Sequence, residues 1–274
     1  MSWIYLSKNG TDEYIGRMAK GAGASVTPIE SWRYEDSPDQ GLVLRGIMKH
    51  KIIKQCWQDG RDFRFMDTGY LGCRPNINNP RGWKVWHRIV QNDLQHGNIV
   101  PRPDDRWRRL GLSLSPWTRQ GRRIVVVAPD DKPCVFYGLD QQKWVHNVVT
   151  KLKKHTDRDI LIRQRTASPD QRTRDPETSF ANLLTQDIWA VVTFNSNAAV
   201  EAIMAGIPAF VLAPCHAALP VSNTDLTVIE SPWRADSDLI HQWLCHLSYG
   251  QFHNSELEDG TALRILDQTQ EILQ

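Results

Sequence analysis

The hydrophobic positions of the chain fall into short continuous runs that alternate with amphipathic or polar segments. The clearest run covers residues 188–194 and predicts a strand that is buried on both faces of a sheet. Polar residues follow it, and the small apolar residues of 198–205 then predict a helix. Gly206 and Pro208 end that helix, and residues 209–212 predict the next strand. Residues 188–212 therefore predict one βαβ unit of a parallel sheet.

The same alternation elsewhere predicts two α/β sheets in succession. In the first, strands are expected at residues 3–6, 25–29, 41–47, 63–67 and 84–90, and helices at 11–20 and 48–58. In the second, strands are expected at 123–128, 160–163, 188–194, 209–212 and 227–230, and helices at 143–154, 179–185 and 198–205. Closing helices are expected at 236–247 and 256–273, and loops or linkers at 30–40, 71–83, 91–121 and 166–178. We therefore expect a first domain over 1–117, a second over 118–255, and a helix over 256–274 that packs back on the first domain.

Composition narrows the class of protein. A chain of 274 residues with 41% hydrophobic and 23% charged residues has the make-up of a globular protein and the length for one large or two small domains. No apolar run is long enough to span a bilayer, and the N-terminus lacks the form of a signal peptide. The five scattered cysteines form no metal or redox spacing. We expect a cytoplasmic monomer without membrane attachment, and the net charge of +2 does not by itself require nucleic acid.

The polar turn after residues 188–194 is the first candidate for chemistry. Asn195, Ser196 and Asn197 lie where a parallel strand ends and a helix begins, and backbone N–H groups at such a position bind anions. Ser196 and Asn197 are thus candidates for holding a diphosphate. Glu201, one helical turn further on, is a candidate for binding the hydroxyls of a ribose. The alternative is an ordinary capped helix with a surface glutamate.

Residues 192–208, with Ser196, Glu201 and the Gly206-Ile207-Pro208 stop, resemble the nucleotide-sugar-binding segment of GT-B glycosyltransferases. The resemblance implies an α/β, GT-B-like fold, in which two Rossmann-like domains face a cleft and a C-terminal helix crosses back to the first domain. The C-terminal domain of that fold binds the nucleotide sugar. Shorter motifs at residues 67–70, 102–106 and 162–165 are similar to bacteriophage glycosyltransferases that modify 5-hydroxymethylcytosine and related pyrimidines in DNA.

The donor implied by this resemblance is a nucleotide sugar, and we expect a UDP-sugar. The residues expected to bind it are Arg163, Arg165, Asn195, Ser196, Asn197, Glu201 and His216. The two arginines follow a predicted strand and can stabilise the leaving diphosphate without a metal. Asp130-Asp131 lacks metal-binding spacing and predicts a turn, so we expect no required metal or other cofactor. Many retaining GT-B enzymes carry two glutamates seven residues apart; this pair is absent around Glu201, which favours inversion.

An inverting transfer needs a base that takes the proton of the acceptor hydroxyl. Asp67 ends a predicted strand just before Gly69 and is the first candidate. The alternative is that its carboxylate caps the following turn, as aspartates often do. His87 is the second candidate for the base, with a purely structural histidine as the alternative.

The prediction of the acceptor rests on the arginines and tryptophans between residues 102 and 123. Arginines neutralise phosphates, and a tryptophan can stack on a base that has left the duplex. The residues expected to bind double-stranded DNA with a modified pyrimidine are Tyr70, Arg88, Asn92, Arg102, Arg106 and Trp107. The alternatives are a saccharide acceptor, as in surface-polysaccharide transferases, and a non-catalytic DNA-binding protein with this fold. One continuous positive face would favour DNA, whereas paired or scattered arginines would favour a saccharide.

Overall fold

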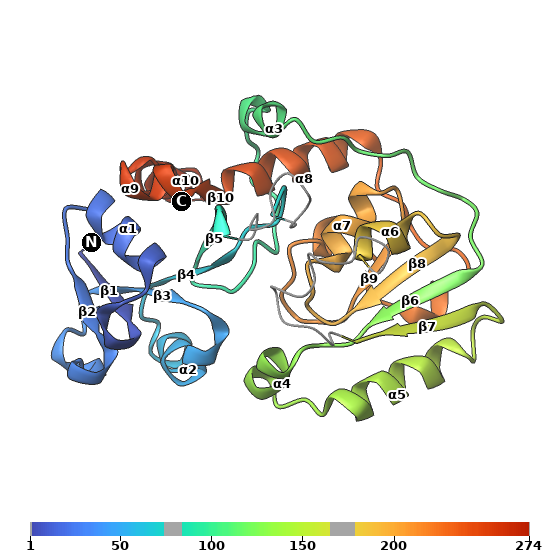
Figure 1. Cartoon of the computed structure of the whole chain (residues 1–274), viewed down its shortest axis with the longest axis horizontal. Helices are drawn as coiled ribbons and strands as arrows, with labels where there is room; N and C mark the ends of the chain where they lie inside the picture. The colour runs from blue at the N-terminus through green and yellow to red at the C-terminus, as the bar shows by residue number, and fades with distance from the viewer. Residues whose placement is uncertain (1, 74–83, 165–178, 274) are drawn as a thin grey trace. The chain divides into compact units, whose positions relative to one another are not determined.

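The computed structural model describes residues 2–73, 84–164 and 179–273, and these form two compact units (Figure 1). Unit 1 combines the described residues up to His96 with those from His246 onward. Unit 2 contains the described residues of Gly97–Cys245. The described chain therefore passes from unit 1 to unit 2 after His96 and returns to unit 1 at His246.

Unit 1 contains one mixed sheet. Its strands lie in the order β10-β5-β4-β3-β1-β2, and β1 to β4 are mutually parallel. β5 runs antiparallel to β4, so the beginning of β5 lies beside the carboxyl end of β4. The strand bounds are β1 (Trp3–Ser7), β2 (Val26–Pro28), β3 (Gly41–Arg45), β4 (Phe63–Thr68), β5 (Trp86–Gln91) and β10 (Gln251–His253).

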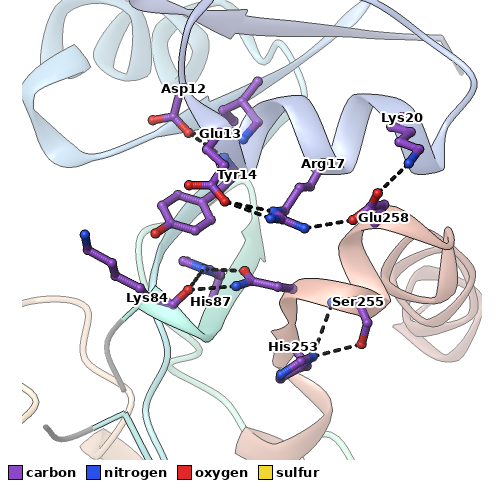
Figure 2. A network of polar contacts seen from close by, with 12 residues as sticks. Asp12, Glu13, Tyr14, Arg17, Lys20, Lys84, His87, His253, Ser255 and Glu258 are labelled. Atoms are coloured by element: carbon purple, nitrogen blue, oxygen red, sulfur yellow. Dashed lines mark hydrogen bonds and ion pairs between the residues drawn. The ribbon is translucent and has the colours of Figure 1, made fainter. Parts of the chain in front are cut away.

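The last residues of the chain complete the core of unit 1. The helices of this unit are α1 (Glu13–Gly21), α2 (His50–Asp59), α9 (Asn254–Glu258) and α10 (Thr261–Leu273), with 3-10 turns at Lys8–Gly10, Ile29–Ser31, Tyr34–Asp36 and Ile47–Lys49. Ile15 and Met18 of α1 pack in one buried cluster with Leu257 of α9 and Leu266 of α10. Figure 2 shows the polar rim of this contact, where Glu258 pairs with Arg17 at 2.7 Å and with Lys20.

Unit 2 contains a four-stranded, all-parallel sheet in the order β7-β6-β8-β9. The strands are β6 (Arg123–Val127), β7 (Asp159–Arg163), β8 (Ile188–Thr193) and β9 (Ala209–Val211). The helices are α3 (Asp105–Leu110), α4 (Asp131–Tyr137), α5 (Gln141–Leu152), α6 (Phe180–Leu184), α7 (Ala198–Met204) and α8 (Ser237–Tyr249), with 3-10 turns at Leu219–Val221 and Leu226–Val228. α8 runs from unit 2 into unit 1, because the division falls after Cys245.

Two buried clusters cover the opposite faces of this sheet. β8 is buried at all of its positions, as its continuous apolar run predicts. Ala190 and Val192 face a cluster that includes Leu152 of α5. Val191 faces a second cluster that includes Leu183 of α6 and residues of α7. Figure 1 shows the same arrangement, with α5 on one face of the sheet and α6 and α7 on the other. The predicted α/β class with parallel strands is therefore confirmed.

Several local predictions are wrong. The segment 91–121, expected as a loop or linker, contains the helix α3, which ends at Gly111 with a φ of +61°. Residues 227–230, expected as a strand, begin in a 3-10 turn because the Asp225 side chain accepts the N–H of Thr227 and caps it. Asp130-Asp131, expected as a turn, instead begins α4, with Asp130 in the N-cap position. The helix expected over 256–273 is divided into α9 and α10, because Gly260 adopts a φ of +79° between them.

The segment before β6 belongs to unit 2, whereas the sequence placed the domain boundary after residue 117. Ser115 N donates to Met204 O at 2.9 Å, and Thr118 N donates to Gly206 O at 2.7 Å. The segment therefore binds the last turn of α7. Gly206 lies against it with a φ of +75°, and a Cβ at this position would approach Pro116 O to 2.0 Å.

We predict that Gly206→Ala destabilises unit 2 by about 2–4 kcal/mol, because it combines a left-handed φ with a clash against backbone. Gly138 is the matched control, since it also has a positive φ, +67°, at a helix C-terminus but open space around its Cβ position. Gly138→Ala should cost only about 1 kcal/mol. Urea unfolding measures both, and equal losses would contradict the packing of Gly206 on Pro116.

Candidate functional site

The carboxyl edge of the unit 2 sheet has the geometry of a ligand site. β6 lies between β7 and β8 in the sheet. The connection from β6 therefore leads to the neighbour on one side, β7, and the connection from β7 leads past β6 to the neighbour on the other side, β8. In open parallel sheets a crevice forms at such a switch point, outside the carboxyl ends of the two strands. Here those strands are β6 and β8, which pair up to Val127 and Thr193. The loops that begin at Ala128 and Phe194 therefore flank the expected crevice.

Ser196 organises the loop that follows β8. Its backbone N donates to Thr193 Oγ1 at 3.3 Å, and its Oγ accepts the N–H of Ala198 at 3.3 Å. Asn197, the residue before α7, has helical backbone angles and makes no side-chain capping bond. The Ser196 hydroxyl also has a proton that it can donate. It is therefore a candidate hydrogen-bond donor for an anion at this edge.

Asn195, Asn197 and Glu201 lie on the same loop and the first turn of α7, and all three are half-buried. His216, which follows β9, is fully buried. Its Nδ1 accepts the N–H of Ala218 at 2.9 Å, so its proton is on Nε2, which lies 3.0 Å from Ser196 O. His216 is thus beside the expected donor residues, but its ring nitrogens bind backbone.

Arg163 is the last residue of β7 and lies at the same edge, with β6 between it and β8. Its guanidinium lies 5.4 Å from the ring centroid of Phe180, and burial lowers its pKa. Arg165 lies outside the described residues. The structure therefore brings Arg163, the loop at 195–197, Glu201 and His216 to one edge of one sheet.

Asp67 lies at the carboxyl edge of the other sheet, in unit 1. Its Oδ1 accepts the N–H of Thr68 at 2.8 Å, and its Oδ2 lies 3.3 Å from Arg88 Nη2. Its side chain keeps 36% of its accessible surface. Arg88 also donates to Thr68 O at 2.7 Å, and its guanidinium lies 5.3 Å from the Tyr70 ring centroid. The carboxylate is thus both a turn cap and half of an ion pair, and Tyr70 is a buried support for that pair.

His87 is fully buried in unit 1. Figure 2 shows its polar contacts. Its Nε2 lies 3.1 Å from Asn254 Oδ1 and 3.4 Å from Lys84 O, and its ring centroid lies 4.1 Å from that of Tyr14. Asn254 also donates to Lys84 O at 2.9 Å. Burial, with a smaller contribution from the charge of Arg45, lowers the pKa of His87 to about 4. The ring is therefore neutral near pH 7.

Charged residues that the sequence reasoning missed also lie at the unit 1 edge. Arg45, at the end of β3, pairs with Asp12 at 3.1 Å, and its guanidinium lies 4.4 Å from the Tyr14 ring centroid. Lys49 donates to Arg45 O at 2.7 Å, and burial lowers its pKa. Both residues could have been found in the sequence as charged residues at the end of a strand. Because the predicted strand extended to residue 47, Arg45 was taken as part of the strand and not as a residue of the edge.

The residues expected to contact DNA are partly buried or paired. Asn92, with a φ of +59°, accepts the N–H of Phe63 at 2.8 Å and so ties the end of β5 to β4. Arg106 is buried in α3, and Arg102 and Trp107 are half-buried. Three further arginines pair with acids: Arg108 with Asp104 at 2.6 Å, Arg109 with Asp105 at 3.8 Å, and Arg122 with Asp187 at 2.8 Å. Arg123 donates to Gln186 O at 2.9 Å, and Arg119 is exposed.

A separate hollow of about 670 Å³ lies at the amino edge of the unit 2 sheet, where β6 and β7 begin. It is lined by Arg122, Lys153, Lys154, His155, Thr156, Asp157, Arg158, Asp159 and Glu230. Arg158 pairs with Glu230 at 2.9 Å, so the lining contains both cations and acids. Ligands of open parallel sheets bind outside the carboxyl ends of the strands, whereas this hollow lies at the amino ends. The carboxyl edge is therefore the better candidate for the site.

Among residues 2–73, 84–164 and 179–273, no group of three His, Cys, Asp or Glu side chains is placed to hold a metal ion. The cysteines there are free, and only Cys215 is not buried. No helix in these parts is long and apolar enough to cross a membrane.

Comparison with known proteins relates the fold to that of sugar transferases. No protein-family model matches the chain, and no curated protein matches it. The solved structures that are similar to it include two of KpsC from Thermosulfurimonas dismutans. Its β-Kdo 2,4 transferase shares 12% identity at a TM-score of 0.50, over 89% of this chain and 90% of that one. Its β-Kdo 2,7 transferase shares 9% identity at a TM-score of 0.51, over 96% and 99%. Likeness at this identity concerns the fold.

We predict that His87 makes the protein sensitive to acid. Between the ordinary pKa of 6.5 and the folded value of about 4, the unfolded chain binds a proton that the folded protein does not. Its contribution is complete above pH 6.5 and falls by up to about 3 kcal/mol as the pH drops to 4. Urea unfolding from pH 7 to pH 4 should show a smaller loss for His87→Gln than for the wild type. The exposed His155→Gln is the control, and parallel curves for His87→Gln and wild type would disprove the assignment.

Proposed function

We propose that the protein is a glycosyltransferase that moves a sugar from a nucleotide-sugar donor to a saccharide acceptor. The observation that carries this proposal is the polar Ser196 loop at the switch point of a parallel sheet. The overall fold supports it, since two solved structures with a similar fold are named as Kdo transferases.

The donor is assigned to unit 2. The Ser196 hydroxyl donates its proton to a phosphate oxygen, and the half-buried guanidinium of Arg163 is the cation of the same edge. Charge-assisted hydrogen bonds from such groups stabilise the leaving diphosphate, and a metal is then not needed. Glu201, on the first turn of α7, accepts hydrogen bonds from the ribose hydroxyls. We retain a UDP-sugar as the expected donor.

The base is assigned to Asp67 rather than to His87. A base must reach the proton that it removes, and Asp67 is partly exposed whereas His87 is fully buried. In an inverting transfer the acceptor oxygen attacks the anomeric carbon, its proton passes to the Asp67 carboxylate, and the bond from that carbon to the diphosphate breaks. Arg88, at 3.3 Å, holds the carboxylate in place.

A saccharide acceptor is favoured over DNA. Affinity for DNA rests on arginines and lysines that are available to neutralise phosphates. Arg108, Arg109 and Arg122 are paired with carboxylates, and Arg106 is buried. Such a charge distribution suits an acceptor that is bound by neutral hydrogen bonds.

We predict sugar transfer to an oligosaccharide and none to DNA. The wild-type protein is incubated with UDP-hexoses and with a nucleotide-activated Kdo, each in the presence of an oligosaccharide or a 5-hydroxymethylcytosine duplex. Mass spectrometry of the acceptors should show a gain of one sugar on the oligosaccharide only. A gain on the nucleoside would establish the DNA acceptor instead. Absence of transfer, together with no rise in Tm with any nucleotide sugar, would refute the transferase assignment.

We predict that Asp67→Asn lowers kcat about 10²–10⁴-fold, because the amide keeps an acceptor for the Thr68 N–H but cannot take a proton. The rise in Tm caused by the donor should persist, since the donor is assigned to unit 2. Asp39→Asn, at an exposed position of unit 1, is the matched control and should keep the wild-type kcat. A kcat of Asp67→Asn within a few-fold of wild type would exclude this base.

A further inference from the structure

We infer that His216 is a positioning residue that fixes the donor-binding Ser196 loop without touching the donor. The inference rests on the proposed function for its kinetic consequences, but the contacts stand by themselves. His216 lies in the loop after β9, and the loop that it holds follows β8, twenty residues earlier.

The two ring nitrogens have different partners, which define one neutral tautomer. Nδ1 accepts the N–H of Ala218 at 2.9 Å, so it carries no proton. Nε2 therefore carries the proton and donates it to Ser196 O at 3.0 Å. The residue has no exposed surface, so its ring is not open to a bound ligand. It acts on a ligand through the Ser196 backbone that it binds.

The carbonyl oxygen of Ser196 accepts two hydrogen bonds that fix the loop. The carbonyl accepts Nε2–H from His216 and also the N–H of Ala199 at 3.2 Å, in the first turn of α7. Ser196 N and Oγ are bound to Thr193 and Ala198. The direction in which the Ser196 hydroxyl offers its proton is thus set by four hydrogen bonds, and one of them comes from another segment of the chain.

The segment that contains His216 is itself bound by α8. The Trp243 indole of α8 donates to Ala217 O at 2.7 Å, and Trp243, Ala217 and Ala218 have no exposed surface. The segment His216–Ala217 is therefore hydrogen-bonded to α8 at Ala217 O and to the Ser196 carbonyl through the His216 ring. Buried hydrogen bonds of this kind give a loop one geometry, because a lost partner leaves a buried polar atom unsatisfied.

Substitution of His216 separates its two contacts. In His216→Asn the side-chain oxygen can still accept the Ala218 N–H, but the shorter side chain cannot reach Ser196 O. In His216→Gln the amide nitrogen can replace Nε2 as donor to Ser196 O. His146→Asn, at an exposed position of α5, is the matched control. Each variant is compared with the wild-type chain for donor KM, acceptor KM and kcat.

We expect His216→Asn to raise the donor KM about tenfold, the effect of one lost hydrogen bond, with kcat and acceptor KM within about twofold. His216→Gln should keep the donor KM within about threefold of wild type. Hydrogen–deuterium exchange of the peptide covering residues 194–199 should become faster in His216→Asn and stay unchanged in His146→Asn. This second readout requires no substrate.

Wild-type donor KM and wild-type exchange in His216→Asn would overturn the inference. So would a fall in kcat alone, which would place the ring in the chemical step. Should the Asn variant fail to fold, His216→Gln decides, because a folded Gln variant with a tenfold higher donor KM would also overturn it. Failure of the proposed function is recognised separately, by a wild-type protein that neither binds nor turns over nucleotide sugars; the exchange experiment then still tests the role of His216 in the loop.

Discussion

The parallel pairing of β8 with β6 is the interaction on which the candidate site depends. It brings Thr193 beside Val127 at the carboxyl ends of both strands, so the polar loops that follow them begin at the same place. The Thr193 hydroxyl donates to Val127 O at 3.4 Å and accepts the N–H of Ser196, which carries the pairing into the loop. Helices on both faces keep β8 fully buried and leave the edge of the sheet as the place for a ligand.

The parts of the fold that the sequence predicts are those with local causes. The continuous apolar run of β8, the small residues of α7 and the Gly206 stop are neighbours in the chain, and their structure follows from their own pattern. The turn at 226–228 could not be predicted in this way, because Leu226 and Ile229 are apolar and belong to the same buried cluster as the strands. Their backbone conformation instead depends on the Asp225 cap.

Strand alternation explains why the two predicted bases have different surroundings. Asp67 lies opposite Arg88 in the β4–β5 pairing, and Thr68 lies opposite His87. Successive side chains of a strand point to opposite faces of the sheet. Arg88 therefore meets the Asp67 carboxylate, while His87 points to the face that α1 covers and contacts Tyr14. The sequence identified both residues, but their different burial depends on a register between strands that are distant in sequence.

Long-range contacts also decide which charges and which ring nitrogens are available to a substrate. Arg122 is one of seven arginines that look available in the sequence, yet its carboxylate partner, Asp187, lies sixty-five residues further along the chain. In the sequence His216 looks like a residue that lines the site. Nothing near it in the sequence shows that its ring binds the backbone of Ser196, twenty residues earlier. Each such ion pair weakens the positive electrostatic potential around residues 102–123, because a nearby opposite charge cancels the potential that would attract phosphates at a distance. A neutral, hydroxyl-rich acceptor needs no such potential, and local pairing of the arginines is compatible with its binding.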